Sequence, residues 1–241
     1  MKYLQRRVST GCSSLDKLLG GGLPSDGVSL IYGEAETGKS SLATQCAVNC
    51  ARAGLKSIFI DSDGTFSSRR LSQIAYHDHE EISPLIILIK PSTFQEQVEA
   101  LDHLENYITK KVGLLVVDTV TSLYRVELGD PKETFELNRE LNRQIAYLSE
   151  IATSHKVATL ITSQVRSIFL GDRVGVEPVA RRVLRFWSKV VLNLEPTGQR
   201  DIIKAVLEKH PTRKRRASCY LTINKTGIQD YESGFSTRMD G

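Results

Sequence analysis

A glycine-rich segment constrains the fold of this chain more than any other feature. Residues 33–40 read Gly-Glu-Ala-Glu-Thr-Gly-Lys-Ser, which matches the phosphate-loop pattern G-x-x-x-x-G-K-[ST] at every fixed position. An apolar run at 28–32 precedes the segment, and a helical pattern follows it. A loop between a buried strand and a helix aims backbone N–H groups and the positive end of the helix at an anion. The segment therefore predicts a phosphate-binding turn in an α/β fold.

The residue types in this loop give its positions expected roles. Lys39 is expected to reach the β- and γ-phosphates of a nucleotide, and the Ser40 hydroxyl is expected to ligate Mg²⁺. The predicted nucleotide-binding residues are Gly33, Glu34, Ala35, Glu36, Thr37, Gly38, Lys39, Ser40 and Ser41.

Apolar runs and helical patterns alternate along the first two thirds of the chain. The runs are typical of buried parallel strands and lie at 28–32, 57–61, 85–90, 114–118 and 157–163. Apolar stripes at helical spacing lie between some of them, at 42–50, 94–108 and 137–152. This alternation predicts right-handed βαβ units, and so a mostly parallel, twisted sheet flanked by helices.

The last third has a different pattern. Apolar runs at 189–194, 202–208 and 218–223 are joined by short turns, which predicts an antiparallel strand extension on one edge of the sheet. The basic cluster 213–216 then falls at a hairpin turn. No repeat, low-complexity block or long linker divides the 241 residues, so we expect residues 1–241 to form a single domain.

Polar side chains end several of the predicted strands. Asp118 ends the run 114–118 and is expected to hold the Mg²⁺ shell opposite the phosphate loop; the alternative is a turn-forming residue. Asp61 and Asp63 follow the second strand, and Gln164 follows the fifth. We predict that Asp63 positions the attacking water and that Gln164 senses the γ-phosphate, the alternative for both being a strand-end cap.

Charge is unevenly distributed along the chain. Residues 181–241 contain 13 Lys and Arg against 6 Asp and Glu, whereas residues 1–180 contain 19 against 22. The basic excess favours a polyanion-binding face over an ordinary solvated face. No apolar run is long enough for a membrane span and no secretory signal is visible, so we expect a cytoplasmic protein with no membrane partner.

Cysteine and histidine spacing argues against a metal centre. Cys12, Cys46, Cys50 and Cys219 form no C-x-x-C pair and are expected to be buried thiols in a reducing compartment. The two neighbouring histidines at 77 and 79 have no companions that complete a zinc site.

Together these segments resemble the RecA/RadA recombinase family. Residues 9–24 resemble the family's approach to the phosphate loop, 59–66 the segment with its catalytic carboxylate, and 116–125 its metal-binding strand and the start of its first DNA-binding loop. The resemblance covers residue 9 to about residue 230 and is closest to the archaeal RadB paralogues. Those consist of a RecA-like ATPase core without an N-terminal helix-hairpin-helix domain, and we expect the same organisation here.

The resemblance implies an ATP- and Mg²⁺-dependent ATPase that assists or regulates the RadA recombinase or other recombination proteins, with homo-oligomers as a further option. Asp63, Lys39 and Gln164 match its catalytic positions. Recombinases carry Glu where this chain has Asp63, and the loss of one methylene retracts the carboxylate by about 1.5 Å. Because misplacement near 1 Å costs roughly 100-fold in rate, we expect weak hydrolysis and little autonomous strand exchange. The Lys209-His210 pair is similar to a Lys-His-Arg signature of RadB chains, with Pro211 in place of the arginine.

The resemblance also implies two DNA-binding loops, after the fourth and fifth strands. They correspond to residues 119–132 and 165–182, and glycines at 171 and 175 are expected to leave the second loop mobile without a ligand. We expect contacts mainly to the phosphate backbone. The predicted DNA-binding residues, including the basic cluster, are Arg125, Arg166, Arg173, Arg181, Arg182, Arg213, Lys214, Arg215 and Arg216.

Two alternatives stay open at this point. A KaiC-like signalling ATPase shares the lead-in to the phosphate loop, but it usually carries two adjacent acidic residues where this chain has Ser62 and Asp63. The second alternative is a nucleotide-gated DNA-binding adaptor whose ATPase activity has been lost, and its mark would be tight ATP binding with no turnover.

Overall fold

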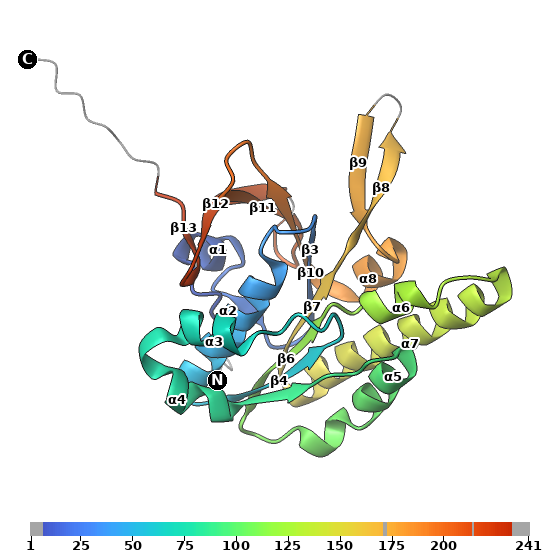
Figure 1. Cartoon of the computed structure of the whole chain (residues 1–241), viewed down its shortest axis with the longest axis horizontal. Coiled ribbons are helices and arrows are strands. Elements are labelled where there is room, and N and C mark those ends of the chain that lie inside the picture. Colours follow the sequence, from blue (N-terminus) through green and yellow to red (C-terminus); the bar gives the residue numbers. More distant parts are fainter. Residues whose placement is uncertain (1–6, 171–172, 214, 233–241) are drawn as a thin grey trace, which may run out of the picture.

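A computed structural model describes residues 7–170, 173–213 and 215–232, with the side chains of 168–175 left aside (Figure 1). Within these residues, nine strands form one sheet in the spatial order β13-β12-β11-β10-β3-β7-β6-β4-β5. Strands β10, β3, β7, β6, β4 and β5 are mutually parallel, and β11 to β13 pair antiparallel. The predicted α/β class, with helices flanking a mostly parallel sheet, is confirmed.

The strands of the central sheet follow the predicted apolar runs. They are β3 (Val28–Gly33), β4 (Lys56–Asp61), β5 (Ile86–Ile89), β6 (Val112–Asp118), β7 (Ala158–Ser163), β10 (Ser188–Pro196), β11 (Ile202–Lys209), β12 (Ala217–Asn224) and β13 (Gly227–Asp230). Two smaller antiparallel pairs are β1 (Arg7–Val8) with β2 (Leu23–Pro24), and β8 (Val165–Leu170) with β9 (Arg173–Pro178).

The helices connect these strands. They are α1 (Ser13–Leu18), α2 (Lys39–Arg52), α3 (Ser68–Ala75), α4 (His79–Ile82), α5 (Phe94–Asp102), α6 (Ser122–Val126), α7 (Pro131–His155) and α8 (Arg181–Trp187). Three 3₁₀ turns are η1 (Tyr76–Asp78), η2 (Ser83–Leu85) and η3 (Leu104–Tyr107). None of the described helices is both long and apolar enough to cross a membrane.

The sheet separates two layers of helices (Figure 1). On one face, Leu42 and Cys46 of α2 pack in a cluster with Ile31 and Phe59. On the other face, Leu141, Ile145 and Leu148 of α7 and Leu184 of α8 pack in a second cluster with the alternate strand residues. Strands covered on both faces are largely apolar, which explains the nearly continuous apolar runs in the sequence.

The C-terminal extension is confirmed with one correction. Strand β10 was expected among the antiparallel strands, but it pairs parallel with β3, so that Ser188 lies opposite Val28 and Leu194 opposite Gly33. The antiparallel part of the nine-stranded sheet begins at the pairing of β10 with β11 and continues through β12 and β13. The reason is the connection through α8, which carries the chain back across the sheet before β10 begins, as parallel pairing requires.

Two local predictions are wrong. The helical stripe expected over 94–108 breaks after Asp102, because residues 104–107 form a 3₁₀ turn with Asn106 N–H donating to the His103 carbonyl. The expected loop at 165–182 is a β8–β9 hairpin followed by α8. Within this hairpin, β-branched residues such as Val165 and Val176 favour extended backbone, and the antiparallel partner lies only a short distance along the chain.

The cysteines behave as small core residues, as predicted. Cys12, Cys46 and Cys50 are buried, Cys219 is partly buried, and none of these cysteines forms a disulfide within the described residues. Burial raises the pKa of the Cys12 thiol to about 12. Burial likewise raises the pKa of the Cys46 and Cys219 thiols, so these three groups stay protonated at neutral pH and contribute by packing.

A buried glutamine joins the two ends of the described chain to α2. The Gln45 side-chain amide donates to the carbonyls of Thr10 (2.8 Å) and Ile228 (2.9 Å), and its carbonyl oxygen accepts from the Ile228 N–H (2.7 Å). The side chain is 6% exposed. Because buried polar groups must find partners, these bonds fix β13 and the N-terminal segment against the helix that begins at the phosphate loop.

We predict that Gln45→Leu destabilises the protein by about 3 kcal/mol, because it leaves buried backbone groups of Thr10 and Ile228 without partners. The expected fall in Tm is about 6–12 °C. Gln95→Leu is the matched control, since Gln95 is exposed on α5 and bonds only Glu99. Chemical denaturation of both variants checks this, and equal losses of stability in the two would contradict it.

Candidate functional site

The phosphate loop sits at the carboxyl end of β3, near the centre of the sheet. It spans Gly33 to Ser40, and α2 begins inside it at Lys39. Gly38 is the residue before the helix and has a φ of 84°, a left-handed conformation that favours glycine. A Cβ on Gly33 would lie 2.3 Å from the Leu194 carbonyl oxygen, so the loop starts in close contact with β10.

Two hydrogen bonds close the loop on itself. The Thr37 hydroxyl donates to the Glu34 carbonyl at 2.8 Å, and the Lys39 ammonium donates to the same carbonyl at 2.6 Å. Glu34, Ala35 and Glu36 are exposed on the outer turn. The loop thus keeps its turn through its own backbone and leaves the start of α2 facing outward.

Lys39 lies between opposing electrostatic influences. Burial lowers the pKa of its ammonium group, and the carboxylates of Asp118, Asp63 and Glu34 act in the opposite direction. Desolvation is the larger effect. A desolvated cation next to a helix N-terminus attracts a phosphate strongly, because the phosphate supplies the countercharge that burial has removed.

Asp118 is a buried carboxylate with no cation bound to it among the described residues. It ends β6 and is 1% exposed, and it accepts hydrogen bonds from the hydroxyls of Thr162 and Ser40. Burial raises the pKa of this carboxyl group, despite those bonds. A carboxylate and a hydroxyl at one point suit Mg²⁺, which takes few protein oxygens and completes its shell with phosphate and water. No cluster of three or more acidic, histidine or cysteine side chains suited to a metal occurs in the part of the chain described.

The two aspartates after β4 have different surroundings. Asp61 is buried and accepts hydrogen bonds from the N–H groups of Thr65 and Phe66, both at 3.0 Å. It therefore acts as a turn cap. Asp63 is partly exposed, and its own N–H donates to the Asp118 carbonyl at 3.2 Å. Asp61 thus shapes the turn that carries Asp63 to the edge of the site.

A chain of side-chain hydrogen bonds joins three of the predicted functional residues. The Gln164 amide nitrogen donates to Asp63 Oδ1 at 3.1 Å. The Arg125 guanidinium of α6 donates to Gln164 Oε1 at 2.5 Å. A residue expected to touch DNA is therefore linked, through the predicted γ-phosphate sensor, to the predicted water-positioning carboxylate.

The other predicted DNA-binding residues are placed in several environments. Arg166 and Arg181 both pair with Glu177, at 2.7 and 3.2 Å. Arg173 lies in β9, but its side chain is outside the described residues, as is all of Lys214. Arg182 and Arg215 are exposed and have no side-chain partner within the described residues.

The basic cluster lies on the β11–β12 turn, as predicted. Arg213 donates to the Lys17 carbonyl at 2.8 Å, and Arg216 lies 3.4 Å from Glu208. Because β11 runs antiparallel to β10, this turn lies at the opposite end of the sheet from the phosphate loop. The six residues of β3 between those ends span about 17 Å. The structure therefore divides the predicted DNA contacts into two groups.

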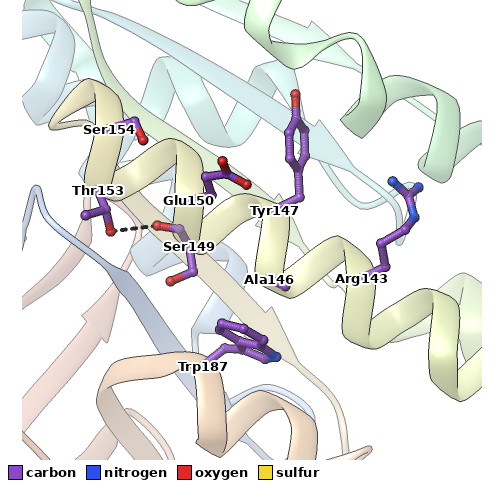
Figure 2. Close-up of a pocket in the computed structure, with 8 residues that line it drawn as sticks. All are labelled: Arg143, Ala146, Tyr147, Ser149, Glu150, Thr153, Ser154 and Trp187. Atoms are coloured by element: carbon purple, nitrogen blue, oxygen red, sulfur yellow. Dashed lines mark hydrogen bonds between the residues drawn. The ribbon is translucent and has the colours of Figure 1, made fainter.

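A surface groove lies apart from the phosphate loop, between α7 and Trp187 (Figure 2). Its volume is about 550 Å³. Trp187 lies across the groove from Ala146 and Ser149, and the indole N–H donates to Asn142 at 3.0 Å. The other lining residues all belong to α7, and most of them are polar. The bond to Asn142 holds Trp187 in place, and no set of the described lining side chains points toward a common centre where catalysis could occur.

Sequence reasoning missed Thr162, the hydroxyl that bonds Asp118. A threonine inside the apolar run 157–163 was the available signal, since a polar residue in a buried strand requires a partner. The partner itself was not visible, because Asp118 lies 44 residues away on the neighbouring strand.

Comparison with known proteins identifies a protein family and several relatives that match this chain. A family model described as Rad51 matches residues 4–231. A DNA repair and recombination protein RadB of Methanococcoides burtonii is 35% identical over 229 residues, which cover 95% of this chain and 100% of the relative. Proteins of the same name from Methanobrevibacter smithii and Methanosphaera stadtmanae are 36% and 34% identical, each covering 90% of this chain and 93% of the relative.

We predict that Asp118→Asn stabilises the ligand-free protein. Because burial raises the pKa of Asp118 above its unfolded value, the ionised group opposes folding at neutral pH, and this cost falls as the pH drops. Asparagine keeps an oxygen that accepts from Thr162. The expected gain is about 1 kcal/mol, or roughly 2–4 °C in Tm, and it shrinks at acidic pH.

Thermal melts with and without Mg²⁺ and ATP check this prediction, and the added stabilisation by Mg²⁺ should be lost in the variant. Asp201→Asn, at an exposed turn residue, is the control. A lower Tm for the ligand-free Asp118→Asn protein would contradict the argument.

Proposed function

The chain belongs to the Rad51 family, and on that premise we propose that it is an ATP-binding, DNA-binding accessory protein of DNA repair and homologous recombination. The observation that carries the proposal is the meeting of Lys39, Asp118 and Asp63 at the carboxyl edge of the parallel strands. Curated relatives that align over nearly their full length are named DNA repair and recombination protein RadB. These findings favour a recombination role over a KaiC-like signalling role.

The nucleotide is ATP in this proposal. The loop from Gly33 to Ser41 holds the phosphates, Lys39 neutralises their charge, and Ser40 and Asp118 hold Mg²⁺. Bound Mg²⁺ supplies charge neutralisation at the β- and γ-phosphates. The desolvated ammonium of Lys39 and the unneutralised carboxylate of Asp118 both support this assignment, because each gains its missing countercharge from the ligand.

Hydrolysis is weak in this proposal. Asp63 orients the attacking water, and its carboxylate is one methylene shorter than the glutamate of the recombinases it resembles. The Gln164 amide bonds one of the carboxylate oxygens at 3.1 Å, which leaves the other for water. ATP then acts mainly as a conformational ligand whose γ-phosphate competes for Gln164.

The hydrogen-bond chain supports coupling between nucleotide and DNA. Gln164 lies between Asp63 and Arg125, so a DNA phosphate that draws Arg125 away also changes the surroundings of Gln164. Such coupling is reciprocal: if bound nucleotide changes the affinity for DNA, bound DNA changes the affinity for the nucleotide by the same factor. This is the physical basis we propose for nucleotide control of DNA affinity.

We further propose that residues 1–241 work as one RecA-like ATPase core in the cytoplasm. Its partners are DNA, contacted mainly at the phosphate backbone, and the RadA recombinase or other recombination proteins. Self-association is a further mode. Exposed arginines such as Arg182 and Arg215 support backbone contacts with DNA, since neither is neutralised by a described side chain.

The test is ATP turnover with and without single-stranded DNA. We expect turnover below about 0.1 s⁻¹, because the Asp63 carboxylate is retracted from its best position. Single-stranded DNA should raise the rate severalfold. Lys39→Ala, which removes the phosphate-binding cation, should lower the rate at least about 100-fold and so exclude a contaminating ATPase.

ATP binding is followed separately by thermal shift with Mg²⁺. Binding without turnover under any condition would replace the ATPase by a nucleotide-gated adaptor. If the protein neither binds nor hydrolyses ATP, the proposed function itself is overturned.

Arg125→Ala should separate DNA binding from coupling. At saturating DNA we expect the severalfold stimulation of turnover to be lost, because a DNA phosphate can no longer change the surroundings of Gln164 by drawing this guanidinium away. Arg139→Ala is the matched control, because Arg139 is exposed on α7, where its guanidinium lies 3.7 Å from Glu136. Full stimulation by saturating DNA in Arg125→Ala would show that Gln164 needs no help from this arginine.

A further inference from the structure

Phe186 is exposed to solvent to an unusual degree for a phenylalanine in a fixed position. It lies in the last turn of α8 and is 72% exposed. Its ring packs edge-to-face on Trp187, with centroids 5.0 Å apart and an interplanar angle of 90°. Trp187 is itself bonded to Asn142 of α7. The Phe186 ring is therefore held on one side by Trp187, and most of its surface is available to a partner at a small entropic cost.

Cations from two parts of the sequence lie near Phe186. Arg182 precedes Phe186 by one helical turn, on the same side of α8, and is exposed. Lys209, at the end of β11, donates to the carbonyls of Arg185 (2.8 Å) and Phe186 (3.4 Å). The ammonium group of Lys209 thus caps the C-terminus of α8, at the backbone carbonyl of the residue that carries the aromatic ring.

A shared carboxylate ties the helix to the basic hairpin. Glu208 is 2.8 Å from Arg185 and 3.4 Å from Arg216, and its side chain is 12% exposed. One acid between two arginines leaves an excess of positive charge. We call the set Arg182, Arg185, Phe186, Lys209 and Arg216 the aromatic–basic patch; it contains four cations, with Glu208 as the acid that contacts it.

The aromatic–basic patch is separate from the nucleotide site. Ser188, two residues after Phe186, pairs with Val28 at the start of β3, whereas the phosphate loop follows the end of that strand. The length of β3 puts about 17 Å between these ends. The patch is therefore free to hold a ligand while the phosphate loop holds another.

We propose that the aromatic–basic patch is a binding site for single-stranded nucleic acid, in which a base stacks on Phe186 and the cations contact the flanking phosphates. An exposed aromatic face among cations matches a strand that alternates flat bases with anions. Duplex DNA keeps its bases stacked inside, so it offers only phosphates to this surface. The inference rests on the DNA binding of the proposed function. It adds that the Phe186 ring makes the protein bind single strands more tightly than duplex.

The chain carries its own reporter for this site. Trp187 is the only tryptophan in the sequence and contacts the Phe186 ring. A 15-nucleotide oligothymidylate should therefore change the tryptophan fluorescence on binding, and the affinity follows from the titration. A duplex of the same length serves as the comparison in which no base is free to stack on Phe186, and heparin as a polyanion without bases.

Phe186→Ala should weaken oligothymidylate binding about tenfold, with less than about twofold change for the duplex and heparin. Because the phosphate contacts remain, the salt dependence of binding should keep its slope. Phe186→Tyr should retain the affinity. Phe135→Ala is the matched control, since Phe135 is 66% exposed on α7 and lies outside the patch. Fluorescence anisotropy of labelled probes measures the Phe186→Ala and Phe135→Ala variants in the same way.

Three outcomes would overturn the inference. Phe186→Ala would leave the affinity for oligothymidylate unchanged, would weaken binding of single strand and duplex equally, or would change the oligomeric state of the protein on sedimentation. The last outcome would make the patch a contact between copies of the chain. If the wild-type protein binds no DNA probe at all, both this inference and the proposed function fail. If wild-type protein binds the probes and Phe186→Ala makes no difference, only this site is wrong.

Discussion

The pairing of β3 with parallel strands on both sides is the constraint on which the rest of the structure depends. β10 and β7 flank it, so this strand has no free edge and both of its faces lie beneath helices. Its residues are therefore mostly apolar until the chain leaves the sheet at Gly33, with Ser29 as a buried polar exception. Parallel pairing also brings the carboxyl ends of β4, β6 and β7 to the same edge, which is why residues from distant parts of the chain meet at the phosphate loop.

The functional edge is built at a cost in electrostatics. Burial lowers the pKa of Lys39 and raises that of Asp118, so each group is held where its charged form is disfavoured. A protein that only had to fold would place neutral residues there. Phosphate and Mg²⁺ remove both penalties at once, since each ligand brings the charge that the protein group lacks. The unfavourable burial of these two side chains is therefore part of what makes the edge suited to a nucleotide.

The C-terminal strands do more than extend the sheet. β13 is fixed to α2 through the buried Gln45, and the side chains of Ile223 and Ile228 approach Gly38. The Arg70 guanidinium bonds the Ser41 hydroxyl and the carbonyls of Asn224 and Lys225, which fastens α3 to the β12–β13 turn. The phosphate loop is thus supported by segments almost two hundred residues further along the chain, and its rigidity depends on the C-terminal fold.

The two basic regions illustrate how one charge imbalance can serve separate surfaces. Arg125 and Arg166 lie near the carboxyl edge of the sheet, one bonded to Gln164 and the other to Glu177. The Arg216 region lies at the opposite edge and is joined to α8 by Glu208.

By itself the sequence determined the phosphate loop, the main apolar strands and the polar residues that end them, because fixed spacing and periodicity are local properties of the chain. Only the tertiary structure decided that Asp61 is a turn cap, that 165–178 is a hairpin, which arginines are already paired, and that Phe186 lies beside Lys209. Each of those depends on which distant side chains packing brings into contact, and one sequence alone carries no record of such contacts.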